Sequence, residues 1–150
     1  MTEKLTLESI TKEIERLSEE MKIKATEGIS KIFEIYPEVS AVCWSQYTPG
    51  FADGDICEHT IGEIYVLKGN VSEELVKEIA SNPYYTEDYD AENELWKDVE
   101  IIPYSDTSAK SINNFINTIS DELERIYDTN NSIVLSRDHG TVVEEYDCGY

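Results

Sequence analysis

The feature that most limits the fold of this chain is a long apolar stripe near its N-terminus. Leu7, Ile10, Ile14, Leu17 and Met21 follow one another at intervals of three and four residues, and the stripe continues to Tyr36. This spacing predicts one α-helix over residues 7–36, capped by Thr6 or Ser9 and ended by Pro37. At 1.5 Å per residue such a helix is about 45 Å long, which exceeds the width of a small domain. Its end is therefore expected to project, or to pair with another chain.

Runs with the alternation of β-strands follow this helix. Val39–Tyr47 and His59–Leu67 are predicted to form an antiparallel pair joined by a connection rich in Gly and Asp. Residues 72–81 then predict a short helix that Ser72 caps and that ends before Pro83. Residues 84–107 show no clear period, so we expect a long loop there, with a helical turn over part of it, residues 91–96.

The C-terminal part of the sequence predicts a third helix over residues 108–127 and a hairpin of residues 133–136 with 142–146. Gly140 is expected at the left-handed position of the connecting turn. Together the elements predict an α+β fold in a single domain of residues 1–150. The long N-terminal helix and the further helices would pack on one face of a roughly four-stranded antiparallel sheet.

Charge is distributed unevenly along the chain. Asp and Glu number 32 and Lys and Arg number 12, which gives a net charge of −20. Residues 1–36 hold eight acids and six bases, so the remaining residues hold 24 acids and six bases, a net charge of −18. Such a charge excludes direct binding of nucleic acid through a positive field, and no apolar run approaches the roughly 20 residues of a membrane span. The acidic surface is either a solvated surface or an interface for a basic protein partner, including one that it meets by imitating nucleic acid.

The densest acidic stretch is residues 84–100, with seven acids and one base. Its aromatic side chains are expected to anchor a partner, because aromatic residues carry much of the binding energy of protein interfaces. The predicted partner contacts are Tyr85, Glu87, Asp88, Tyr89, Asp90, Glu92, Glu94, Trp96 and Asp98.

The most distinctive run in the sequence is Trp44–His59, which reads W-x-Q-Y-T-P-x-F-x-D-G-D-x-C up to Cys57. This run resembles a block in small uncharacterised proteins of bacteriophages and their bacterial hosts, and the last six residues resemble the chain ends of such proteins. His59 stands where these proteins often carry an aromatic residue. The resemblance implies a phage or a phage-infected bacterium as the setting, and it implies no activity.

Two interpretations of this block remain open from the residues. It is either a loop that Trp44 and Phe51 anchor on its own hairpin, or the lining of a pocket for a small ligand. The residues of that pocket would be Trp44, Gln46, Tyr47, Phe51, Asp53 and Asp55.

The cysteines and histidines give a further alternative. Three cysteines at wide spacing, and an N-terminus without a secretory signal, favour reduced thiols in a cytoplasm. Each histidine has a cysteine nearby, so a tetrahedral zinc site is an alternative to packed cysteines and surface histidines. Its four ligands would be Cys57, His59, His139 and Cys148. A Cys–His nucleophile needs an electropositive setting, which a chain of this charge lacks, and we find no other catalytic set.

The sequence thus predicts a cytoplasmic protein that acts by binding and without a cofactor. The first hypothesis is an acidic inhibitor, encoded by a phage, that occupies a basic surface of a host protein. The alternative is a domain that binds a small ligand or zinc through the block at residues 44–59. A homodimer through the N-terminal helix is a further expectation, unless the stripe only covers the sheet.

Overall fold

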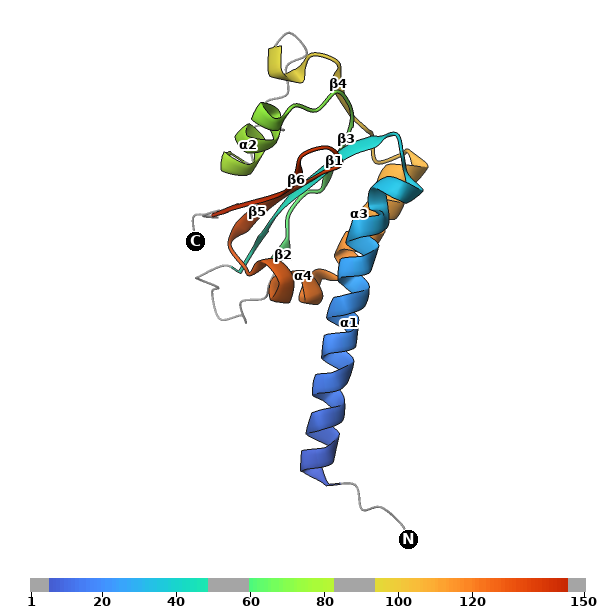
Figure 1. The fold of residues 1–150 in the computed structure, drawn as a ribbon, viewed down its shortest axis with the longest axis vertical. Helices are drawn as coiled ribbons and strands as arrows, with labels where there is room; N and C mark the ends of the chain where they lie inside the picture. Colours follow the sequence, from blue (N-terminus) through green and yellow to red (C-terminus); the bar gives the residue numbers. More distant parts are fainter. Residues whose placement is uncertain (1–5, 49–59, 83–93, 146–150) are drawn as a thin grey trace.

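The computed structural model describes residues 6–48, 60–82 and 94–145. Helix α1 spans Leu7–Ile35, as predicted, and its N-terminal half extends beyond the rest of the molecule (Figure 1). Its start is closed by a capping box: the Ser9 amide donates to Thr6 Oγ1 and the Thr6 amide donates to Ser9 Oγ, both at 3.1 Å. These bonds satisfy amides that a helix end otherwise leaves without a partner.

Strand β1, Val39–Tyr47, lies in the middle of an antiparallel sheet with the order β4-β3-β1-β5-β6. A short strand, β2, also pairs with the end of β1. The bounds of the others are β2 Thr60–Ile61, β3 Tyr65–Gly69, β4 Val99–Ile101, β5 Asn131–Ser136 and β6 Gly140–Glu145. The class and the antiparallel pairing are as predicted, whereas the sheet is larger than the four strands expected.

Two differences enlarge the sheet. The single strand expected over residues 59–67 is divided into β2 and β3, because the register with β1 shifts by one residue between them: Gln46 faces Ile61, whereas Cys43, three residues earlier, faces Tyr65. Strand β4 falls in the stretch predicted as a loop, and three residues are too few to show an alternating pattern.

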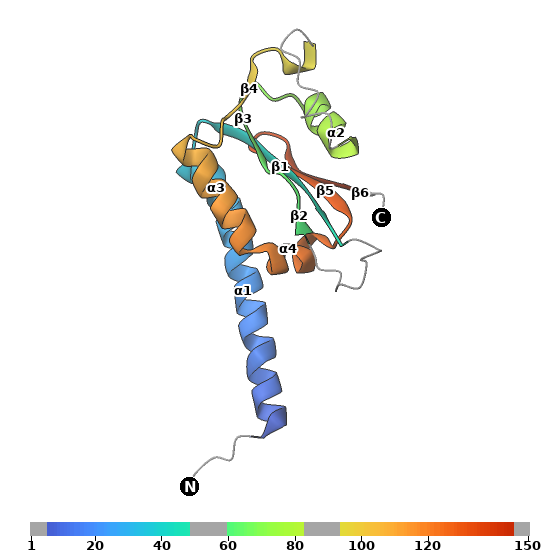
Figure 2. The ribbon, with the colours of Figure 1, turned by 180° about the vertical axis from the view of Figure 1, so that it is seen from behind.

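Helices cover both faces of the sheet, which corrects the expectation of one covered face. Helix α2, Glu73–Ser81, lies on one side, and α1, α3 (Thr107–Thr118) and α4 (Ser120–Tyr127) lie on the other (Figures 1 and 2). The reason is in β1, whose Ala41 and Cys43 belong to the core under α2 while Val42 and Trp44 belong to the opposite core. A strand that is apolar on both faces has to be covered on both.

The strict alternation expected along β1 fails at its first residue. Val39 lies in the same core as Val42, whereas strict alternation would place it with Ala41. The pairing of β1 with β3 shifts its register between Val39 and Ala41, and an extra residue in one strand reverses the faces of the residues before it.

The helix predicted over residues 108–127 is two helices, α3 and α4, which meet at Ile119. The apolar period runs through the break, so the pattern does not reveal it. Polar side chains in the last turns of α3 bond to its own carbonyls: Asn117 Nδ2 donates to Asn113 O at 2.9 Å and Thr118 Oγ1 to Asn114 O at 2.7 Å. Such bonds compete with the regular helix and often bend it.

Several local predictions are confirmed. Ser72 caps α2, and its Oγ accepts from the Leu75 amide at 3.1 Å. A helical turn, η2, covers Glu94–Trp96, and Gly140 takes a φ of 75° at the end of the hairpin turn. None of the helices in the described ranges is long and apolar enough to cross a membrane.

Candidate functional site

The predicted partner contacts are only partly within the described residues. Tyr85, Glu87, Asp88, Tyr89, Asp90 and Glu92 lie outside them. Glu94 and Asp98 are exposed, as a contact surface requires. Trp96 is 1% exposed and belongs to the core under α2, so its prediction as an interface anchor is wrong. Its indole stabilises the fold by covering the α2 side of the sheet.

Asp98 is held in place by its backbone. Its φ of 62° is left-handed, and its carbonyl accepts from the Asn70 amide at 2.9 Å. That carbonyl also approaches Gly69 so closely that a Cβ built on Gly69 would lie 1.9 Å from it. The turn before β4 is therefore fixed against the end of β3, and it fixes where the exposed Asp98 and Glu94 side chains begin.

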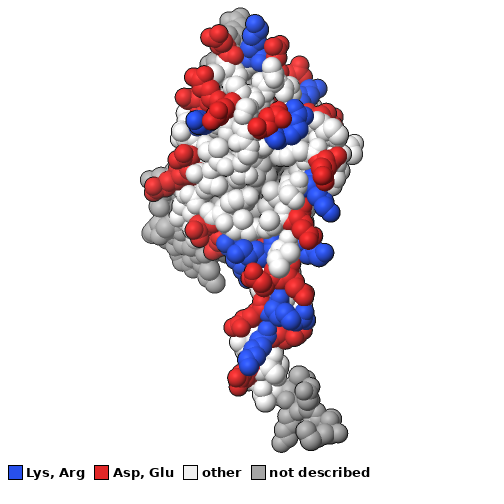
Figure 3. All heavy atoms as spheres, viewed as in Figure 1, with Lys and Arg blue, Asp and Glu red and all other residues white. Residues whose placement is uncertain are grey.

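The charges of the surface follow the division seen in the sequence. Acidic and basic groups alternate along the projecting part of α1, whereas carboxylates predominate around a broad uncharged area of the domain (Figure 3). Residues 36–48, 60–82 and 94–145 hold sixteen acids and six bases, a net charge of −10. Even if every base neutralised one acid, ten carboxylates would keep their charge. The bases that pair with acids within 3.3 Å include Lys68 with Glu100 and Lys77 with Glu73.

The described start of the distinctive block is part of the core. Trp44 is 2% exposed and Gln46 is 0% exposed, both on the side of α4. Trp44 Nε1 donates to Gln46 Oε1 at 3.0 Å, and Gln46 Nε2 donates to Leu123 O at 2.9 Å and to Asp128 O at 2.6 Å. The Gln46 amide thus joins the central strand of the sheet to the middle of α4 and to the residue that follows its C-terminal end.

The predicted ligand pocket receives no support from these residues. The Gln46 side chain is enclosed and its amide has its partners inside the protein, so it offers no polar group to a ligand. Trp44 does border a cavity, together with Cys43, Tyr65 and Ile79, but the volume of this cavity is about 20 Å³. That is room for about one water, whereas ligand pockets measure several hundred Å³. Tyr47 is half-buried, and Phe51, Asp53 and Asp55 lie outside the described residues.

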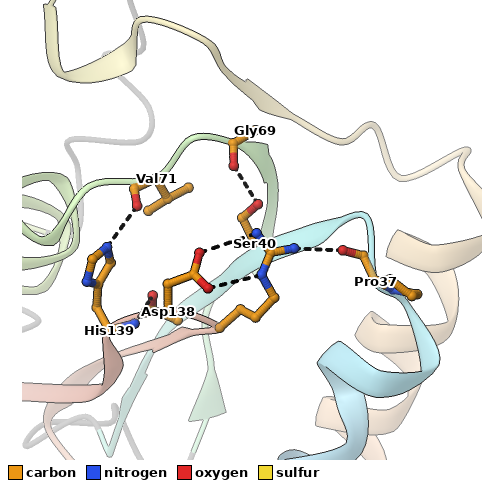
Figure 4. A network of polar contacts seen from close by, with 8 residues as sticks. Pro37, Ser40, Gly69, Val71, Asp138 and His139 are labelled. Carbon is orange, nitrogen blue, oxygen red and sulfur yellow. Dashed lines mark hydrogen bonds and ion pairs between the residues drawn. The ribbon is translucent and has the colours of Figure 1, made fainter.

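Of the predicted zinc ligands, the structure describes His139, and Cys57, His59 and Cys148 lie outside the described ranges. His139 Nε2 is 3.1 Å from Val71 O, and the His139 amide donates to Ser136 Oγ at 3.1 Å (Figure 4). The ring therefore connects the β5–β6 turn to the segment that enters α2. Within the described part of the chain, no three His, Cys, Asp or Glu side chains come together as metal ligands do.

The same end of the sheet carries a polar network that sequence reasoning missed (Figure 4). Arg137 Nη1 donates to Pro37 O at 2.7 Å, and the Arg137 amide donates to Ser40 O at 3.0 Å. Ser40 Oγ in turn donates to Gly69 O at 2.6 Å. These contacts join the start of β1, the end of β3 and the β5–β6 turn. No spacing in the sequence indicates them, because the partners come from three distant segments.

Cys43, which lies within the described residues, is not suited to act as a nucleophile. Cys43 is buried under α2, and burial raises the pKa of its thiol to about 12. The thiol therefore stays protonated at neutral pH, whereas a reactive cysteine needs a depressed pKa.

A groove between α1 and α3 was also missed. It has a volume of about 210 Å³ and is lined mainly by apolar side chains, among them Ile32, Ile112 and Phe115. Beside this groove the Phe115 ring lies directly over Gly28. Only a glycine allows this contact, because a Cβ atom on residue 28 would lie 2.3 Å from Phe115 Cζ. Few polar groups line it, so it offers little to orient a ligand.

Comparison of the chain with protein-family models, with curated proteins and with solved structures gives no match.

Proposed function

We propose that this protein acts by binding, and that its acidic domain occupies the basic surface of a partner protein. The observation that carries the proposal is the charge asymmetry of the surface: a net charge of −10 over the described residues 36–145, beside a helix α1 with seven acids and five bases. Like charges crowded on one small domain repel one another, and a basic partner relieves that repulsion. Complementary potentials also speed association.

The end of the molecule where α2, η2 and β4 meet is the proposed contact surface (Figure 1). Six exposed acidic residues lie in these elements or in the turn between η2 and β4. Only three basic residues lie in the same elements or directly beside them. The acids are Glu73, Glu74, Glu78, Glu94, Asp98 and Glu100, and the bases are Lys68, Lys77 and Lys97. The sequence between α2 and η2, residues 83–93, adds four acids and no base.

Proteins that handle nucleic acid are the partners that such a surface fits best, because their binding sites are built to receive a dense row of negative charges. The resemblance of the block at residues 44–59 supports a phage-infected bacterium as the setting, and its cytoplasm as the compartment. Occupation of the partner's site would inhibit it without any chemical step.

The test is capture of the partner from a nuclease-treated bacterial lysate, with the tagged protein at low and at high salt, read by mass spectrometry. We expect a basic protein that binds at low salt and is lost at high salt, because salt screens charge pairs on the surface. The captured protein should also be displaced by duplex DNA. A captured partner whose association rate does not depend on salt would refute the electrostatic proposal.

A matched pair of variants tests the location. The triple variant Glu74→Gln, Glu78→Gln and Glu94→Gln removes three charges from the proposed surface. The control Glu15→Gln, Glu19→Gln and Glu34→Gln removes three from α1, where the side chains are also exposed. We expect the first variant to weaken capture and the control to retain it; equal effects would show that this end of the molecule is not the contact surface.

A further inference from the structure

The projecting half of α1 carries an apolar stripe that stays exposed among the residues the structure describes. The exposed fractions are 84% for Leu7, 41% for Ile10, 59% for Ile14, 46% for Leu17 and 54% for Met21. This part of the helix extends past the domain in both views (Figures 1 and 2). Exposed apolar surface that forms a contiguous stripe marks an interaction site, because single exposed apolar residues are common but rows of them are not.

The spacing of the stripe identifies what it can bind. The intervals of three, four, three and four residues place Leu7, Ile14 and Met21 at one core position of a heptad, and Ile10 and Leu17 at the other. A stripe confined to these two positions is the narrow seam of a coiled coil, whereas a helix that lies on a sheet needs a wider face. The occupant should therefore be another helix.

The direction of that helix follows from where the stripe goes next. Ala25 comes one turn after Met21, and it is 2% exposed because its own domain covers it. Helix α4 lies beside α1 at the end of the domain from which α1 projects (Figure 1). A helix that lay on the stripe parallel to α1 would have to continue into the space of α4. A helix of opposite direction ends below α4 and avoids the collision.

We propose that the occupant is the same stripe of a second copy of this chain, in an antiparallel two-stranded coiled coil. With the helices reversed, Leu7 faces Leu17 of the second copy and Ile10 faces its Ile14, and the two-fold axis repeats both pairs. Four apolar layers result, and each residue meets a partner that meets it in return, as a two-fold interface requires. No other sequence is needed to complete the seam.

Charge supports a second copy in this orientation. Helix α1 has seven acids and five bases, whereas residues 37–150 carry a net charge of −18, so two copies repel each other least along α1. The reversed arrangement places the two acidic domains at opposite ends of a seam about 15 Å long, which exceeds the screening length of about 8 Å at physiological salt. Glu13 meets its own counterpart beside the seam, but Arg16 ion-pairs with Glu13 and Glu20 and supplies the opposite charge.

The interface is small, because eight partly exposed side chains cover less area than the roughly 1,200 Å² of a strong complex. We therefore expect a weak, reversible dimer. Sedimentation velocity of the full chain, from micromolar to millimolar concentration at physiological salt, should show the mass rise from 17.1 kDa towards twice that value. A chain that stays monomeric over this range, or that forms a trimer or larger species, would overturn the proposal.

A matched pair of variants tests the seam. Ile14→Glu places a charge in two of the four layers and should weaken the dimer by at least about 100-fold. Ile23→Glu changes a side chain of similar exposure, 52% against 59%, on another face of the same helix and should leave the dimer unchanged. Both positions are exposed, so the melting temperature measured at dilute concentration should stay that of the original chain. Equal dimerisation of the two variants would refute the seam.

The orientation is tested by oxidative cross-linking in a background with Cys57→Ser and Cys148→Ser, since Cys43 is buried. Leu7→Cys mixed with Leu17→Cys should form a disulfide-linked dimer. Leu7→Cys alone should form none, because its counterpart lies at the other end of the seam. A dimer from Leu7→Cys alone would show that the helices are parallel and would overturn the proposal.

Discussion

Gln46 offers the sharpest test of how this fold is held together. The substitution Gln46→Leu keeps the approximate volume of the side chain and removes its amide. Trp44 Nε1 then loses its acceptor, and the carbonyls of Leu123 and Asp128 lose the donor that they share. Trp44 and Leu123 are 2% and 0% exposed, so water has little access to either.

The magnitude follows from the groups left without partners. Each buried polar group that loses its hydrogen bond costs about 1–3 kcal/mol. The Leu123 carbonyl keeps its α-helical bond from the Tyr127 amide, and Asp128 is exposed, so we count one group, Trp44 Nε1, at about 2 kcal/mol. The greater apolarity of leucine returns about 1 kcal/mol. The expected loss is therefore about 1 kcal/mol, or a melting temperature about 2–4 °C lower for a chain of this length.

Urea unfolding followed by tryptophan fluorescence and circular dichroism measures this loss as a lower midpoint at an unchanged slope. Gln46→Glu is the companion variant: its carboxylate accepts from Trp44 but, when ionised, donates to neither carbonyl. Burial raises the folded-state pKa of such a carboxyl, so its penalty relative to the original chain should shrink as the pH falls and protonation restores one donor. A Gln46→Leu protein within about 0.5 kcal/mol of the original would refute the reasoning.

Three further predictions concern the sheet, the buried thiol and the start of α3. Gly69→Ala should lower the free energy of unfolding, measured in urea, by about 2–4 kcal/mol, because φ is 103° and the new Cβ would lie 1.9 Å from Asp98 O. The control Gly140→Ala should lower it by only about 1 kcal/mol, because φ is 75° but no atom lies within 4 Å of the new Cβ. Burial raises the pKa of Cys43 from 9.0 to about 12, so the stability that it contributes is complete below pH 9 and is lost as the pH rises towards 12, at about 1.4 kcal/mol per pH unit. Cys43→Ala should remove this alkaline slope in urea titrations, and an unchanged slope would contradict it. Hydrogen bonds from the first turn of α3 lower the pKa of Asp106, so its stabilisation is present above its ordinary pKa of 3.8 and lost as the pH falls through the lowered value. Thermal melts should show that Asp106→Asn, which still caps the helix, loses this acid dependence, whereas Asp106→Ala also melts lower at neutral pH.

The parts of the fold that the sequence predicts well are those with a strong period or a clear cap. Helix α1 repeats its apolar residues along its length, β1 is a run of apolar and β-branched residues between Pro37 and Pro49, and Ser72 and Gly140 mark a helix start and a hairpin turn. The missed features have no such local signal. Strand β4 is three residues long, and the break at Ile119 falls inside an unbroken apolar period. Helix α2 lies alone on its side of the sheet because both faces of β1 are apolar and need cover. The apolar period of a helix does not tell which of the two faces that helix covers.

The candidate site shows a similar limit. Trp96 lies among acids in the sequence, as an interface anchor would, but its place in the core depends on how η2 turns towards α2. Gln46 next to Trp44 is typical of a ligand pocket as well as of a buried hydrogen bond, and the donors and acceptors that decide between them lie about 80 residues away. The exposed stripe of α1 could be found from its spacing, but which half its own domain covers could not.

The place of β1 in the sheet has a consequence for how the chain is made on the ribosome. Val42 pairs with Leu135, so the central strand is synthesised about 90 residues before the neighbour that completes it. During that interval its apolar faces and one open edge are available to other nascent chains, which is the condition that favours aggregation. The last hairpin therefore acts as the closing step of folding, and chains cut short before β5 should be substrates for chaperones and proteases rather than partly active proteins.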